Sequence, residues 1–250
     1  MLYDEITIDK SIDSESAHEF LMEATRLASS SELEDIGQRM QKKSALFQAV
    51  LQPDSIADLS EKKLKTLFKY MFFLRRKSAI LLQSNTMESI RNEITTLLYG
   101  EQDLAVRYNR FVSTISGLNE MLSVSLASEL LFFTNPEKYW LMNNWIWDPK
   151  TKGGALSLIL QNDYEVKGET SGELYKSIGE AMHMVNQAGQ VEGFSRISSG
   201  LYGTHIFLAC VYAVYMFTVF KIKLSKEFNR ILPQLPELAR RVLGVQKLEI

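Results

Sequence analysis

The strongest hydrophobic feature of this sequence is the stretch from Ile206 to Phe220, which contains no charged residue. Most of its fifteen residues are bulky and apolar, and lysines follow directly at 221 and 223. A helix that crosses a bilayer needs about 20 apolar residues, so this stretch is short for a span. We expect it to be the central helix of a helical core, because other helices must cover so apolar a segment. A membrane span and an interfacial or oligomer-forming helix are the alternatives.

Apolar residues recur at helical spacing along the rest of the chain. Stripes spaced three and four apart predict helices near residues 17–27, 33–50, 64–71 and 90–97. Residues 119–133 are apolar on most sides, which predicts a helix or helix pair buried near the middle of the fold. Alternation at a period of two, which is typical of strands, is confined to short segments at 3–8 and 164–166.

Helix-capping and turn-forming residues indicate where several helices begin and where loops lie. Ser60 is expected to cap one helix, Asn85 with Glu88 resembles a capping box, and Asn135-Pro136 should start another helix. The clearest loops are predicted at 148–154 and 187–203, which are rich in glycine or turn residues.

Together these patterns predict one all-α domain over residues 1–250. It should be a compact body of many helices around the helix at 206–220, with lobes 1–117 and 118–250 as an alternative organisation. Cys210 is the only cysteine and cannot form an internal disulfide, and the first residues lack the pattern of a secretory signal. We therefore expect a cytoplasmic protein.

Charge is distributed unevenly although the net charge is only −2. Residues 1–37 carry a net charge of −8, and residues 38–77 carry +7. Either the acidic segment lies on a basic surface of its own chain, or the two segments serve different partners.

A basic amphipathic helix accounts for most of this positive charge. Its predicted core face holds Leu64, Leu67, Phe68 and Met71, and bases occupy another face and extend its positive end. Clustered bases can follow a phosphate backbone, although a merely solvated face is the alternative. The bases are Lys62, Lys65, Lys69, Arg75, Arg76 and Lys77.

All three tryptophans lie between residues 139 and 147. Two interpretations compete: a stacking or partner-binding platform, and core packing of a short helix. Asn143 and Asn144, which lie between the aromatic residues, keep the first interpretation open beside core packing. The candidate binding residues are Trp140, Asn143, Asn144 and Trp145.

The residue sets of common catalysis do not appear. His18, His183 and His205 are far apart and lack partner cysteines, so no metal site is expected. Cys210 lies in the apolar stretch and should be a buried residue rather than a nucleophile. No carboxylate is expected to be buried and tuned for acid or base chemistry. The sequence thus predicts neither a catalytic group nor a cofactor.

The segment 116–147, with Ser116-Gly117-Leu118-Asn119 at its start and Asn135-Pro136-Glu137 further on, resembles the helix-hairpin-helix DNA glycosylase superfamily. In that family a Gly-x-Gly hairpin grips a DNA phosphate, and a following aspartate assists glycosidic cleavage. The corresponding positions here are Ser123-Val124-Ser125 and Asn143. The resemblance therefore implies a related helical scaffold without the glycosylase's catalytic residues.

Three functional hypotheses follow. The leading one is a non-enzymatic helical module that binds protein subunits or nucleic acid through the bases between Lys62 and Lys77. The second is an enzyme, or its inactive remnant, on a glycosylase-like scaffold that acts on nucleic acid, with Asn143, Asn144 and Trp145 lining a base-sized pocket. The third is a membrane-associated helical protein that uses Ile206 to Phe220.

Overall fold

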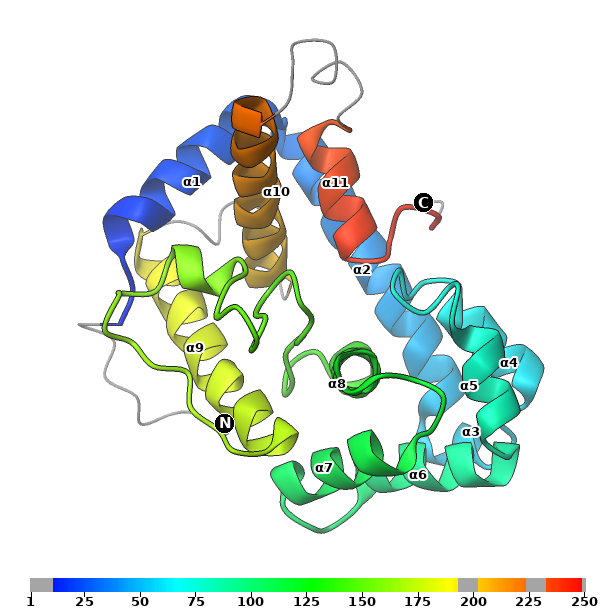
Figure 1. The fold of residues 1–250 in the computed structure, drawn as a ribbon. Coiled ribbons are helices and arrows are strands. Elements are labelled where there is room, and N and C mark those ends of the chain that lie inside the picture. Colours follow the sequence, from blue (N-terminus) through cyan, green and yellow to red (C-terminus); the bar gives the residue numbers. More distant parts are fainter. Residues whose placement is uncertain (1–10, 193–201, 224–232, 249–250) are drawn as a thin grey trace. The chain divides into compact units, whose positions relative to one another are not determined.

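The computed structural model describes residues 11–192, 202–223 and 233–248. Over these residues the chain is all-α, as predicted, and only two isolated bridges, Ile12 with Leu160 and Asp148 with Gly153, have β character. The helices, shown in Figure 1, are α1 (Ser14–Leu27), α2 (Ser30–Leu51), α3 (Pro53–Ile56), α4 (Glu61–Phe68), α5 (Ser78–Ser84), α6 (Met87–Tyr99), α7 (Leu104–Thr114), α8 (Glu120–Thr134), the 3₁₀ turn η1 (Leu156–Leu158), α9 (Ser171–Glu192), α10 (Gly203–Lys223) and α11 (Leu235–Val242).

The described residues group into two compact units, each built from separate chain segments. Unit 1 contains residues 41–144 and 165–181, and unit 2 contains the rest. Helices α2 and α9 contribute residues to both units. The units therefore follow different boundaries from the lobes 1–117 and 118–250 suggested by the sequence, because the chain enters each unit more than once.

Helix α8 lies in the core of unit 1. Every residue from Ser123 to Phe133 is buried, which confirms the burial predicted for this segment. Helices α6 and α7 pack against it, and the hydroxyl of Tyr108 in α7 donates to the carbonyl of Val124 at 2.7 Å. The ring of Tyr108 stacks on Tyr175 of α9, with centroids 4.4 Å apart. Polar and aromatic contacts thus fix α7 and α9 in unit 1.

Helix α10 lies between α1 and α11 in unit 2 (Figure 1). Its residues 206–211, 213 and 214 are buried, as expected for a core helix. From Tyr215, which is 41% exposed, the helix is no longer enclosed. The prediction that all of Ile206 to Phe220 is core is therefore correct only for its first part, because α1 and α11 cover α10 incompletely.

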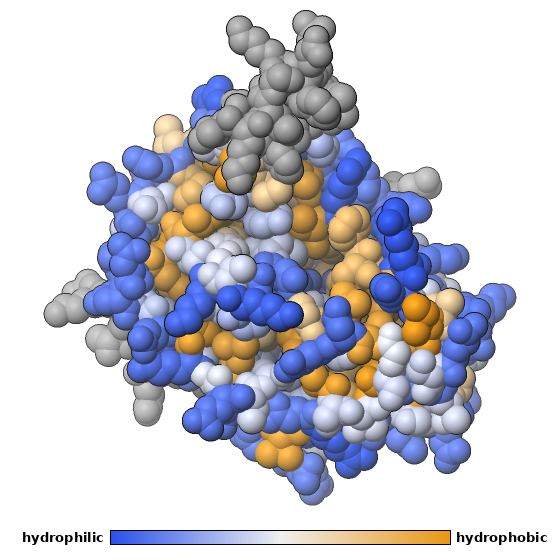
Figure 2. Space-filling model, viewed as in Figure 1, coloured by the Kyte–Doolittle hydropathy of each residue, from blue (hydrophilic) through white to orange (hydrophobic). Residues whose placement is uncertain are grey.

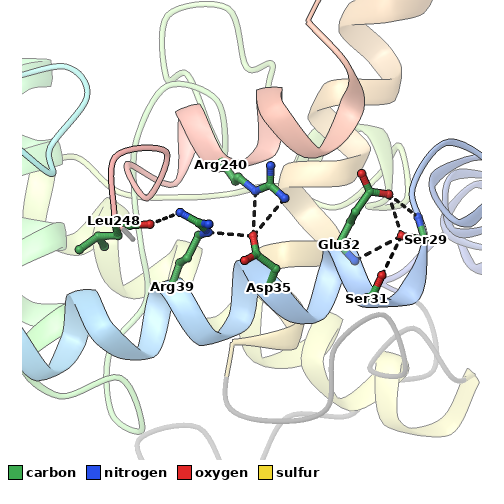
Figure 3. Close-up of polar contacts among 7 residues, drawn as sticks. All are labelled: Ser29, Ser31, Glu32, Asp35, Arg39, Arg240 and Leu248. Carbon is green, nitrogen blue, oxygen red and sulfur yellow. Dashed lines mark hydrogen bonds and ion pairs between the residues drawn. The ribbon is translucent and has the colours of Figure 1, made fainter. Parts of the chain in front are cut away.

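Charged residues connect α2 to the C-terminal segment of unit 2 (Figure 3). The carboxylate of Asp35 accepts hydrogen bonds from Arg39 at 2.8 Å and from Arg240 in α11 at 3.0 Å. Arg39 also donates to the carbonyl of Leu248. At the start of α2, Ser29 and Glu32 form a reciprocal cap, and the bonds from Ser29 lower the pKa of Glu32.

Several predicted boundaries shift by a few residues. Ser60 caps α4 as expected, but the cap of α6 is Thr86, not Asn85. Asn135 and Pro136 end α8 and enter a turn, so no helix starts there. The predicted loop at 187–203 is helical up to Glu192, and its remainder to residue 201 lies outside the described residues. The alternating segment at 3–8 also lies outside them, whereas 164–166 forms no strand.

Candidate nucleic-acid interface

Helix α4 of unit 1 carries the first half of the predicted basic face. The side chain of Ser60 accepts from the amide of Lys63, and Leu64, Leu67 and Phe68 are buried. Because these apolar residues face the core, the lysines of the helix lie on its solvent side, as the spacing predicts. The exposed lysines of α4 are Lys62, Lys63 and Lys65.

The second half of this basic face is not helical. α4 ends at Phe68, and the chain then passes through consecutive turns up to Lys77. Met71 and Leu74 are buried and anchor these turns to the core. The prediction of one basic helix extending to Lys77 is therefore wrong. Arg75, Arg76 and Lys77 reach the surface from turns, with Arg75 half-buried and the other two exposed.

We define the basic surface as the seven bases from Lys62 to Lys77: Lys62, Lys63, Lys65, Lys69, Arg75, Arg76 and Lys77. No aspartate or glutamate occurs between Lys62 and Met87. Lys65 pairs with Glu61 one turn earlier, at 2.5 Å. Within the described part of the chain, the other six bases form no ion pair. Their charge is therefore available to a partner.

The turns also present backbone donors. Leu74 and Lys77 donate their amides within the turns, to Met71 and to Leu74. The amides of Arg75 and Arg76 donate to no group among the described residues. Unused amides beside cationic side chains are the donors that commonly contact phosphate oxygens.

An exposed aromatic ring lies within this basic surface. Phe72 is 53% exposed, and the guanidinium of Arg75 lies over its ring, 5.8 Å from the ring centre. Figure 2 shows hydrophobic and hydrophilic residues side by side over α4, α5 and the turns between them. Sequence reasoning missed Phe72, although the aromatic residues at 70, 72 and 73, set among bases, were an available signal.

The predicted aromatic platform lies mostly inside the protein. Asn143 and Trp145 are 6% and 7% exposed, Trp140 is half-buried, and Asn144 alone is exposed. The ring of Trp145 packs near Tyr212, with centroids 6.2 Å apart. The hydroxyl of Tyr175 accepts a hydrogen bond from the backbone amide of Trp140 and donates one to its carbonyl. Core packing therefore describes this cluster better than a stacking surface.

Two polar atoms of this cluster are unsatisfied. The side-chain oxygen of Asn143, in unit 1, and the indole nitrogen of Trp145, in unit 2, have no hydrogen-bond partner within the described ranges. Ser123, Val124 and Ser125, which match the hairpin of the glycosylase superfamily, lie inside α8 rather than in a turn. The kinship with that superfamily stays a prediction.

One interior carboxylate contradicts the sequence analysis. Glu129 lies within the buried face of α8, where burial raises its pKa, and it pairs with the buried Lys43 at 2.7 Å. Cys210 is buried as expected, and burial raises its pKa to about 12. Such a thiol stays protonated and is a poor nucleophile. Among the described residues, no three His, Cys, Asp or Glu side chains are grouped as a metal site would need.

A separate open groove of about 420 Å³ occurs in unit 2, between α1, α10 and the start of α11. It is lined by apolar residues such as Val214 and Phe217 and by the ion pair of Glu23 with Arg26. It shares no residue with the predicted sites. Within the described ranges, none of the helices has both the length and the apolar character that a membrane crossing requires.

Comparison of the chain with protein-family models, with curated proteins and with solved structures found no match.

Proposed function

We propose that this protein is a non-enzymatic helical module that binds nucleic acid through the basic surface of unit 1. The observation that carries the proposal is the group of six bases free of ion pairs in a segment without a single acidic residue. A protein whose net charge is −2 gains no general attraction for a polyanion, so the attraction must be local. Such a surface binds phosphates chiefly by releasing counterions.

The arrangement suits backbone contact rather than reading of a base sequence. Lys62 and Lys63 lie on α4, whereas Lys69, Arg76 and Lys77 lie on the following turns. Long cationic side chains with unused turn amides beside them make contacts to phosphates that are independent of sequence. We therefore expect little preference among base sequences. We place this activity in the cytoplasm, where a single buried thiol is stable.

The test compares a variant of the basic surface with a control of matched charge. The variant Lys62→Gln, Lys69→Gln, Arg76→Gln removes three exposed bases, and the control Lys138→Gln, Lys150→Gln, Lys167→Gln removes three exposed bases elsewhere. Binding of labelled DNA and RNA oligonucleotides to the full chain is measured by fluorescence anisotropy over a salt series. Circular dichroism checks that each variant is folded.

The parent should lose about a hundredfold in affinity between about 50 and 200 mM salt, because several phosphates are neutralised. The variant should bind more weakly, and its log–log salt slope should be smaller by about two to three. The control should keep the parent's slope. Absence of binding by the folded parent at low salt, or an equal loss in the control, would contradict nucleic-acid binding. An acidic protein subunit would then be the remaining partner for this surface.

A further inference from the structure

Phe72 is a large apolar side chain that is exposed within the chain segment of the basic surface. A single exposed apolar residue is common on protein surfaces and by itself indicates nothing. The setting of Phe72 is distinctive because basic residues flank this exposed residue on both sides in the sequence. Lys69 precedes it, and Arg75, Arg76 and Lys77 follow it.

The turn holds the ring in place. Its neighbours Met71 and Leu74 are buried, and the amide of Leu74 donates to the carbonyl of Met71 at 3.1 Å. With these residues anchored, the backbone directs Phe72 outward. The Nε of Arg75 donates to the carbonyl of Lys69 at 3.2 Å, which positions its guanidinium over the Phe72 ring. A ring braced in this way loses little entropy when a second flat group stacks on it.

We propose that the basic surface takes single-stranded nucleic acid, with an unpaired base stacked on Phe72 and the flanking phosphates on Lys69, Arg76 and Lys77. This inference rests on the proposed nucleic-acid binding and adds the class of ligand. Stacking requires a nucleobase whose flat face is free, and the nucleobases of a duplex are already stacked on one another. A ring with cations on both sides is the usual arrangement for binding a single strand without sequence preference.

The experiment uses the full chain with a labelled oligothymidylate of about 20 nucleotides and a duplex of about 20 base pairs. The variants are Phe72→Leu, which keeps an apolar side chain without a flat ring, and Phe72→Trp, which enlarges the ring. The matched control is Tyr215→Leu, which removes an aromatic ring of similar exposure from unit 2. Duplicate titrations with an oligouridylate of the same length compare RNA with DNA.

We expect Phe72→Leu to weaken oligothymidylate binding about tenfold, with the salt slope unchanged, since the ring contacts no phosphate. Duplex binding should change less than about twofold, and Tyr215→Leu should bind like the parent. Phe72→Trp should bind at least as tightly as the parent, and its additional tryptophan emission should be quenched by the oligonucleotide.

Two results would overturn the single-strand inference alone: equal oligothymidylate binding by the parent and Phe72→Leu, or tighter binding of the duplex than of the single strand by the parent. In either case the proposed function stands if the glutamine variant of Lys62, Lys69 and Arg76 still loses affinity. If the folded parent binds neither oligonucleotide at low salt, the proposed function and this inference are both overturned.

Discussion

The ammonium nitrogen of Lys43 lies 2.7 Å from Oε2 of Glu129, and neither side chain reaches solvent, with exposures of 0% and 2%. The same ammonium lies 4.0 Å from the ring centre of Phe133. Burial lowers the pKa of Lys43 and raises that of Glu129, while their mutual attraction opposes both shifts. The pair links α2 to α8 inside unit 1.

We expect Glu129→Gln to destabilise the protein strongly. Removing one partner leaves the ammonium of Lys43 buried without its counter-charge, which costs about 3–5 kcal/mol of unfolding free energy. Chemical unfolding by urea, followed by circular dichroism, measures this change. A stability equal to that of the parent would mean that the ammonium finds another partner or is neutral in the fold.

The double variant Lys43→Met, Glu129→Leu is the control for this prediction. It replaces both charges by apolar side chains, so most of the lost stability should return. Glu61→Gln, which breaks the exposed pair with Lys65, should change stability by about 1 kcal/mol or less.

We expect part of the acid sensitivity of the fold to come from His205. Burial lowers its pKa to about 3, from an ordinary value of 6.5. Between pH 3 and 6.5 His205 is therefore neutral in the folded protein, whereas the same side chain takes up a proton in the unfolded chain. Its contribution to stability is complete above about pH 6.5 and decreases as pH falls toward 3, by about 1.4 kcal/mol per pH unit.

The slope of stability against pH, measured by urea unfolding between about pH 4 and 7, tests this prediction. His205→Gln should flatten the slope in this window, whatever its effect on absolute stability. Identical slopes for His205→Gln and the parent would rule out His205 as the source.

We expect Val214→Asp to be far more damaging than the same change at the next position. Val214 is 7% exposed in α10, so an aspartate there would be a buried charge without a partner and should cost about 3 kcal/mol or more. Tyr215 is 41% exposed, and Tyr215→Asp should cost much less. Thermal melts of the two variants would contradict this if they showed equal losses.

We expect the purified protein to release no free base from duplex DNA that contains uracil or alkylated bases. Asn143 stands where the glycosylase resemblance places a carboxylate, and an amide side chain cannot accept a proton as a catalytic carboxylate does. The side chain is also buried. Chromatography of reaction supernatants measures base release. Release by the parent that disappears in Asn143→Ala would show the protein to be an enzyme.

Several features of the candidate site could be read from local spacing. Ser60 caps α4, and Leu64 and Leu67 turn inward while Lys62 and Lys65 turn outward, because residues three and four apart share one face of a helix. Phe72 could not be found in this way. It follows Phe68 by four positions, so a continuing helix would place it on the buried face. Because α4 ends at Phe68, the turn directs Phe72 outward instead.

The sequence by itself determined the all-α class, the burial of α8 and the first part of α10, and the burial of Cys210. These follow from runs and periodicities of apolar residues, which act over a few turns of one helix. Only the tertiary structure decided that Lys43 meets Glu129 and that Arg240 meets Asp35, since the partners lie 86 and 205 positions apart. It also decided the incomplete cover of α10 and the division into two discontinuous units. Contacts between distant segments depend on how whole helices pack, and no local pattern in the chain encodes that arrangement.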